Sequence, residues 1–221
     1  TAKPSPVLQL SLSPHPPLFH AQEIGLDQYE QAVPCDHCKS VWYCNEACKK
    51  AAWDEHHERL CFGPNPSQAD PLLALHKYVQ RPDTDYGFAI IVKMYARMSQ
   101  AVDRGVPSHD AAAIFRYHAC CARGFVPPLS SQHKMLTELE LVRAAVFDQR
   151  LKEYYTPEMY LRLDTAVCLN GIGERFMRET PPFAADVSFL GHILVLLNHD
   201  CDPNCAFHFE ASHGCRRAGC I

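Results

Sequence analysis

The sequence contains no apolar run long enough to cross a membrane. The longest, FLGHILVLLN at 189–198, is far short of the roughly 20 residues that a transmembrane helix needs. Positive charge is also scarce, with 21 Lys and Arg against 25 Asp and Glu and a formal net charge of −4. Proteins that bind nucleic acids normally have a basic face, so direct nucleic-acid binding is not expected. The first 20 residues lack the basic segment and apolar stretch of a secretory signal peptide. We therefore expect a soluble intracellular protein, nuclear or cytoplasmic, without membrane contact.

The sequence is rich in cysteine, with 12 in 221 residues. Hydrophobic residues make up 47% and charged residues 21%, which is typical of a folded globular protein rather than a disordered one. Inside a cell, clustered cysteines more often bind metal ions than form disulfide bonds. The spacing of the cysteines is therefore the first guide to function.

Five cysteines and three histidines lie within residues 35–61. Zinc prefers thiolate and imidazole ligands, and a C-x2-C pair presents two thiolates from one tight turn. An H-x3-C pair places two ligands on one face of a helix. One closed tetrahedral zinc site is therefore predicted, and its four ligands are Cys35, Cys38, His57 and Cys61. The adjacent His56 is an alternative to His57.

This spacing resembles the MYND zinc finger, in which two C-x2-C pairs, a C-x3-C pair and an H-x3-C pair bind two zinc ions in a cross-braced arrangement. The segment VPCDHCKSVWYCNEACKKAAWDEHHERLC matches the last three pairs. It also has an aromatic residue before Cys44 and a tryptophan, Trp53, in the expected helix. In this family the finger often binds short proline-containing peptides, and exposed Trp42 and Tyr43 are expected to suit such a peptide.

The resemblance also implies that Cys44 and Cys48 share a second zinc ion with the first C-x2-C pair. No cysteine precedes Cys35, however. His20 and Glu23 stand near the expected place of the missing pair, and both residue types bind zinc. A second site containing these two residues is therefore a hypothesis. The alternative is that Cys44 and Cys48 are thiols packed against a helix.

Residues 72–168 are predicted to be mainly helical, because apolar residues recur there at spacings of three and four. Thr156 before Pro157 is a typical helix start, and Asn45 is a suitable N-cap for a helix in the cysteine cluster. Cys168 is expected in the core. We expect helices at PLLALHKYV (71–79), YGFAIIVKMYARMSQAV (86–102), HDAAAIFRYHACCA (109–122), HKMLTELELVRAAVFDQRLKEYY (133–155) and TPEMYLRLDTAVCL (156–169).

The segment LLNHDCDPNC (196–205) ends an apolar run with N-H-x-C-x-P-N. This heptapeptide resembles the signature of the SET methyltransferase fold. Its position after a MYND-like finger and helices is similar to that in the SET and MYND domain-containing protein-lysine methyltransferases. The resemblance covers roughly residues 30–205. It implies binding of S-adenosylmethionine by Asn198 and His199, with Asn170 in CLNGIGE as a weaker candidate, and methyl transfer to a lysine of a protein such as a histone.

Two family features are missing from the sequence. The family has a glycine-rich segment near its N-terminus that contacts the cofactor, but no glycine precedes Gly25 here. The family also has a tyrosine late in the SET domain that orients the substrate lysine, but no tyrosine follows Tyr160. Both groups act by positioning. We therefore expect a truncated chain that is weak or inactive as an enzyme, and no catalytic residue is assigned. The alternative function is a non-enzymatic module that binds proline-containing peptides.

Together these observations predict an α+β protein with a small zinc-bound MYND finger, a mainly helical SET insert and an incomplete SET β-region. The expected divisions are a proline-rich lead-in at 1–30, the finger at 31–62, the helical region at 72–168, a partial SET core at 169–205 and a divergent tail at 206–221.

Overall fold

A computed structural model of the 221-residue chain describes residues 32–43, 45–81, 84, 86–113, 115–116, 129–170, 172–178, 183–189, 207–212 and 215–220. At residues 86, 129–131 and 169–170, and in the strands after 171, only the backbone is described. The predicted site residues His20, Glu23, Cys44, Asn198 and His199 lie outside the described residues.

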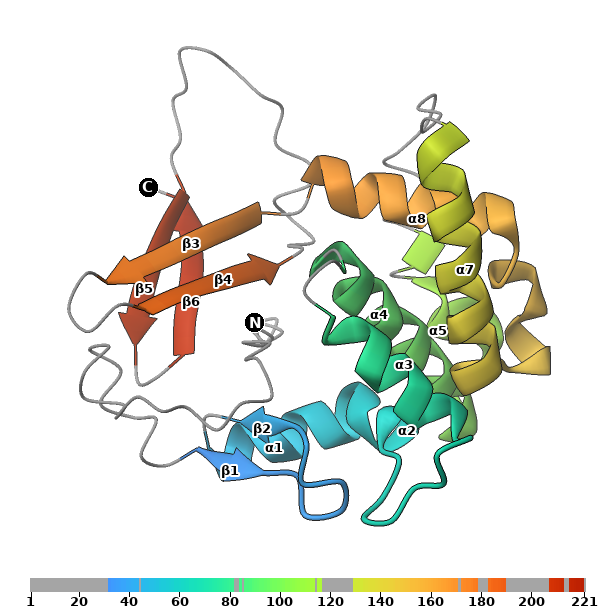
Figure 1. Cartoon of the computed structure of the whole chain (residues 1–221), viewed down its shortest axis with the longest axis horizontal. Coiled ribbons are helices and arrows are strands. Elements are labelled where there is room, and N and C mark those ends of the chain that lie inside the picture. Colours follow the sequence, from blue (N-terminus) through green and yellow to red (C-terminus); the bar gives the residue numbers. More distant parts are fainter. Residues whose placement is uncertain are drawn as a thin grey trace.

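The cysteine-rich segment forms a short hairpin followed by one nearly continuous helical stretch (Figure 1). Strands β1 (Val33–Pro34) and β2 (Trp42–Tyr43) pair antiparallel. The helical stretch comprises α1 (Glu46–Ala52), a π-helical turn η3 (Trp53–His57) and α2 (Glu58–Leu60). The Asn45 side chain accepts a hydrogen bond of 2.8 Å from the amide of Cys48, which confirms Asn45 as the N-cap.

The helical region contains α3 (Pro71–Val79), α4 (Tyr86–Asp103), α5 (Ser108–Ala111), α7 (Leu129–Val146), the 3-10 helix η4 (Gln149–Tyr154) and α8 (Pro157–Asn170). Figure 1 shows α4 near the middle of the molecule, with the finger below it. Among the described residues, no helix has the length and apolar character needed to cross a membrane.

The start of α8 agrees with the sequence, because the Thr156 hydroxyl accepts a hydrogen bond of 3.2 Å from the amide of Met159. The single helix expected at 133–155 is wrong, since α7 ends at Val146 and η4 begins three residues later. Asp148 is extended there, and its carboxylate accepts a hydrogen bond of 2.8 Å from the amide of Arg150. The Asp148 side chain thus caps the start of η4, and α7 does not continue through this position.

The core of the helical region is rich in aromatic side chains. Tyr95 on α4 is completely buried, and its ring lies 5.0 Å from Phe115, 4.7 Å from Tyr155 and 6.4 Å from Tyr160. Its hydroxyl donates a hydrogen bond of 2.8 Å to the carbonyl of Tyr154. The expectation that Cys168 lies in the core is wrong, because this cysteine is on the exposed side of α8.

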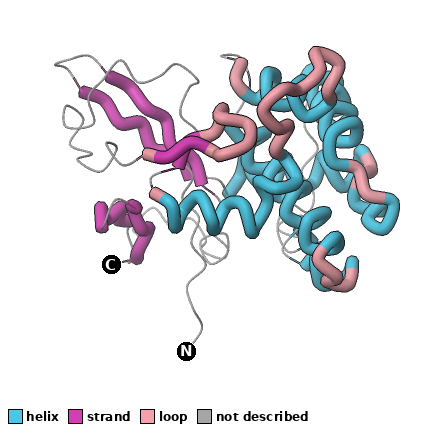
Figure 2. The backbone as a smooth tube through the Cα atoms, turned by 90° about the horizontal axis from the view of Figure 1, so that it is seen from below, coloured by secondary structure: helices cyan, strands magenta, loops and turns pink. Residues whose placement is uncertain are grey.

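Four more strands form two antiparallel hairpins. Strand β3 (Ile172–Arg178) pairs with β4 (Phe183–Phe189), and β5 (Phe207–Ser212) pairs with β6 (Cys215–Cys220). Both views place the hairpins to one side of the helical region (Figures 1 and 2). The described part of the chain is thus mainly helical with short two-stranded sheets, in agreement with the mixed class expected from the sequence.

Candidate metal centre

The four residues with zinc-ligand spacing come from two elements of the finger. Cys35 follows β1, and Cys38 lies in the turn that leads to β2. The turn is closed by hydrogen bonds from the Cys35 amide to the Val41 carbonyl (2.8 Å) and from the Lys39 amide to the Cys35 carbonyl (3.2 Å). Lys39 adopts a left-handed conformation with φ of 57°, which turns the chain sharply after the second cysteine. His57 ends the π-helical turn, and Cys61 follows α2 in an extended conformation.

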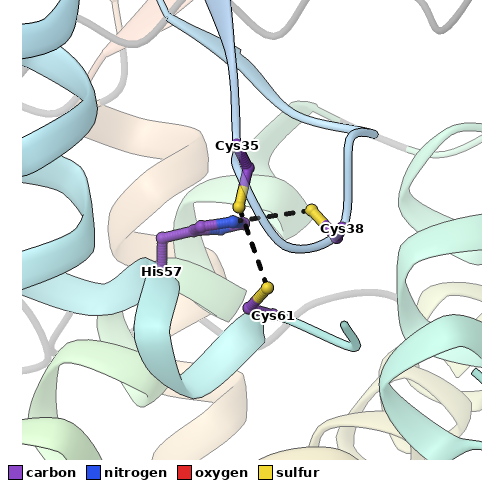
Figure 3. Close-up of side chains that lie close together, drawn as sticks. All are labelled: Cys35, Cys38, His57 and Cys61. Atoms are coloured by element: carbon purple, nitrogen blue, oxygen red, sulfur yellow. Dashed lines mark hydrogen bonds between the residues drawn. The ribbon is translucent and has the colours of Figure 1, made fainter. Parts of the chain in front are cut away.

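The side chains of these residues converge on one point (Figure 3). The Sγ atoms of Cys35 and Cys61 are 3.8 Å apart, and Cys38 Sγ is 3.7 Å from His57 Nε2. All four ligand atoms lie within 4.8 Å of one another. A tetrahedral zinc ion with Zn–S bonds of about 2.3 Å separates two sulfurs by about 3.8 Å, and sulfur from nitrogen by slightly less. Sulfurs of a disulfide bond would be about 2.05 Å apart. The donor set and its spacing therefore fit a zinc ion.

Electrostatics in the cluster favour a neutral imidazole. Burial lowers the pKa of His57 to about 4, and positive neighbouring groups act in the same direction. A neutral ring keeps a lone pair for a metal. Burial raises the pKa of the Cys38 thiol to about 12. Burial also opposes ionisation of Cys35, but backbone hydrogen bonds from Cys38 and His37 lower the Cys35 pKa overall. A bound cation would offset the cost of burying such thiolates.

Aromatic rings surround the centre. The Tyr43 ring meets His57 edge-on at 5.8 Å, and Trp53 meets the same histidine at 5.9 Å. Tyr43 is 7% exposed, whereas Trp42 is 51% exposed. The expectation that both aromatic residues are exposed is therefore wrong for Tyr43. Neighbouring residues of a strand point to opposite faces, so only one of this pair can reach solvent.

His56 lies outside the four-residue group. It is buried, with its Nδ1 3.9 Å from Glu55, and lies close enough to Lys93 and Arg97 of α4 to interact with their charges. Burial, followed by the positive charges of Lys93 and its neighbours, lowers the pKa of His56 well below its usual value. The structure thus places His57, rather than His56, at the cluster.

Two of the other predicted site residues, Cys48 and Asn170, lie in the described part of the chain. Cys48 lies on α1, half-buried against the apolar core of the finger, and belongs to no metal-binding group among the described side chains. Asn170 is the last residue of α8, where only the backbone is described. His20, Glu23, Cys44, Asn198 and His199 fall outside the described part of the chain, so their predicted roles remain predictions.

One contributor to the site was missed by the sequence reasoning. Gln100 on α4 is buried and hydrogen-bonds the backbone of the finger on both sides of His57. A signal was present in the sequence, because Arg97, Gln100 and Arg104 recur at helical spacing. They form a polar stripe that runs along the otherwise largely apolar α4 and ends at Arg104, directly after the helix. That signal alone does not indicate which surface the stripe contacts.

The comparisons with known proteins agree with this geometry. A family model of the MYND finger matches residues 21–61. The zebrafish protein-lysine N-trimethyltransferase SMYD5 is 30% identical to this chain over 173 residues, which is 72% of the chain and 39% of the zebrafish protein. The chain belongs to the SET and MYND domain-containing family.

Two further members of the family are similar to this chain. Mouse SMYD5, also a protein-lysine N-trimethyltransferase, is 29% identical over 185 residues, covering 78% of the chain and 40% of the mouse protein. A SET and MYND domain-containing protein of Dictyostelium discoideum is 23% identical over 197 residues, covering 87% of the chain and 55% of that protein. The chain thus spans about two fifths of the length of the SMYD5 relatives. No solved structure matches it.

Proposed function

We propose that Cys35, Cys38, His57 and Cys61 bind one structural zinc ion that fixes the fold of the MYND finger. The observation that carries this proposal is the spacing of 3.7–3.8 Å between paired ligand atoms. With four protein ligands the coordination shell is complete, which is typical of structural rather than catalytic zinc. The ion would hold the β1–β2 turn against the end of the helical stretch.

We further propose a second zinc site that contains Cys44 and Cys48, with His20 and Glu23 in place of the family's first cysteine pair. The finger model matches from residue 21, well before Cys35, which supports a role for this preceding segment. The N-cap bond from Cys48 to Asn45 fixes the start of the helix that carries Cys48.

Metal analysis tests the second site. We expect two zinc ions per purified chain, and a loss of one ion in Cys48→Ser, because a hydroxyl is a poor replacement for a thiolate. The matched control is Cys168→Ser, an exposed cysteine on α8, which is expected to keep both ions. One zinc ion in the unmodified chain, unchanged in Cys48→Ser, would contradict the second site and leave the first intact.

We also propose that the chain is part of a protein-lysine methyltransferase that uses S-adenosylmethionine. The relatives named protein-lysine N-trimethyltransferase support this activity. Asn198 and His199 would contact the cofactor, with Asn170 nearby, and the substrate would be a lysine of a protein such as a histone. Residues 72–168 would be the helical insert and 169–205 part of the SET core. The protein would act inside the cell, in the nucleus or the cytoplasm.

Calorimetric titration with S-adenosylmethionine tests this activity. Because the proposed cofactor contacts of Asn198 and His199 lie within these 221 residues, we expect a measurable heat of binding. Asn198→Ala is expected to weaken binding about 10- to 100-fold, by removing a polar contact to the cofactor. Asp202→Ala, at a variable position of the same motif, is expected to bind as the unmodified chain does. Equal binding by all three proteins would contradict the assignment of Asn198.

The second candidate function is a non-enzymatic module that binds proline-containing peptides. The observation that favours it is the exposed Trp42 ring on β2, where the partner residue is Pro34. An exposed aromatic surface on a short hairpin suits an extended peptide. Absence of any heat at millimolar S-adenosylmethionine, together with binding of a proline-containing peptide that is lost in Trp42→Ala, would favour this function over the enzymatic one.

A further inference from the structure

The helical stretch of the finger is interrupted at the point where it presents a predicted metal ligand. Between α1 and α2, residues Trp53–His57 form a π-helical turn. A π-turn contains one more residue than an α-turn, so the residues after it are rotated by about 100° relative to an uninterrupted α-helix. This rotation sets the direction in which His57 and Cys61 project. Isolated π-turns are rare, so contacts that stabilise this one matter for the site.

Contacts of this kind come from α4. The Gln100 side chain donates a hydrogen bond of 2.6 Å to the Trp53 carbonyl and accepts one of 3.0 Å from the Arg59 amide. The two bonded backbone groups lie on either side of His57. Gln100 is 3% exposed, so neither bond is replaced by water without local opening.

Two arginines extend the same stripe, Arg97 on α4 and Arg104 directly after the helix. Arg104 donates to the Asp54 carbonyl and forms a 2.6 Å ion pair with Glu58. Arg97 forms a 2.7 Å ion pair with Glu55. Each of these arginines is more than a third exposed, and exposed ion pairs contribute little. The buried amide of Gln100 is therefore the strongest of these contacts, and the hydrogen bond from Arg104 to the Asp54 carbonyl supports the same turn more weakly.

We infer that Gln100 is a positioning residue for the metal centre: from the helical region, it holds the π-turn of the finger in the geometry that aims His57 and Cys61 at the zinc. This inference rests on the proposed zinc site. Its consequence is that zinc retention depends on a side chain that is not a ligand and lies on a different structural element. Outer contacts of this kind commonly tune metal affinity.

The rate of zinc release to an excess of a chromophoric chelator tests the inference. Gln100→Met keeps the length of the side chain but removes both hydrogen bonds. We expect zinc release at least about tenfold faster, and a shifted visible spectrum of the cobalt-substituted protein because the ligand geometry relaxes. The matched control is Ser99→Ala. The neighbouring Ser99 is also buried, but it bonds the Val146 carbonyl and the Tyr155 hydroxyl within the helical region. Ser99→Ala is expected to lower the melting temperature without changing zinc release or the cobalt spectrum.

A milder pair of variants applies if Gln100→Met does not fold. Arg104→Met removes only the contact with the Asp54 carbonyl and the Glu58 ion pair, and is expected to speed release by a few-fold. Arg162→Met removes a comparable exposed pair with Glu158 on α8 and is expected to leave release unchanged. Unchanged release in a folded Gln100→Met protein, or equal release in the two arginine variants, would overturn the positioning role. Absence of zinc from the unmodified protein would instead overturn the zinc site itself.

Discussion

Cys61→Ser is expected to remove one zinc ion per chain and to unfold residues 35–61. The sulfur of Cys61 lies 3.8 Å from that of Cys35 and belongs to the only four-ligand cluster among the described side chains. Structural zinc contributes an apparent binding free energy of about 10–16 kcal/mol in isolated finger peptides, and most of the folding energy of such small units comes from the metal. The buried core of the finger is too small to replace that contribution, since only a few side chains form it.

Zinc content and the amide NMR spectrum of the finger measure this effect. In Cys61→Ser the finger resonances are expected to collapse toward unfolded positions, whereas most resonances of α7 and α8 keep their dispersion. Cys168→Ser provides the comparison for a thiol on an exposed helix surface and is expected to match the unmodified chain. A Cys61→Ser protein that keeps its full zinc content and a folded finger would show that the ligand assignment is wrong.

Tyr95→Ala is expected to destabilise the helical region by about 4 kcal/mol, the usual cost of truncating a large aromatic side chain in a packed core. Tyr95 is completely buried between Phe115, Tyr155 and Tyr160, which approach it from other elements. Since a domain is typically stable by only about 5–15 kcal/mol, this single change removes a large part of the total.

Urea unfolding followed by circular dichroism checks the effect of Tyr95→Ala. The matched variant Tyr95→Phe keeps the ring contacts and loses only the 2.8 Å bond to the Tyr154 carbonyl. Its expected cost is about 1 kcal/mol, the usual net value of one hydrogen bond. The difference between the two variants isolates the packing contribution. A loss of less than about 1 kcal/mol in Tyr95→Ala would contradict the central position of this ring.

Features that depend on neighbouring residues were predictable from the sequence. The expected segment at 71–79 coincides with α3, and the helix starts at Asn45 and Thr156 are as predicted. The spacing within 35–61 also indicated the four side chains that the structure brings together, because a C-x2-C turn and an H-x3-C pair impose short distances between their own members.

Features that depend on distant contacts were not predictable. The apolar pattern in the sequence continues past Val146, but the helix α7 ends at this residue. The Val146 carbonyl instead accepts a 2.7 Å hydrogen bond from the Tyr155 hydroxyl, nine residues later in the chain. The Tyr43 side chain points inward because of the register in which β2 pairs with β1. The sequence of a two-residue strand is too short to predict that register. The π-turn of the finger is held by Gln100, which lies 47 residues along the chain from Trp53, whose carbonyl it binds. A pattern of neighbouring residues cannot predict so distant a contact.

The contacts between the finger and α4 imply that the finger does not fold independently of the helical region. Many small zinc modules can be transplanted between proteins because their outer faces tolerate water. Here the excised segment 32–61 would expose His56, which is 5% exposed in the intact protein, and would leave the Trp53 carbonyl and the Arg59 amide without Gln100. A graft of these residues onto a foreign scaffold would need to bring the polar stripe of α4 with it. The smallest segment that could be transferred with the finger therefore includes α4, which lies outside the cysteine-rich sequence.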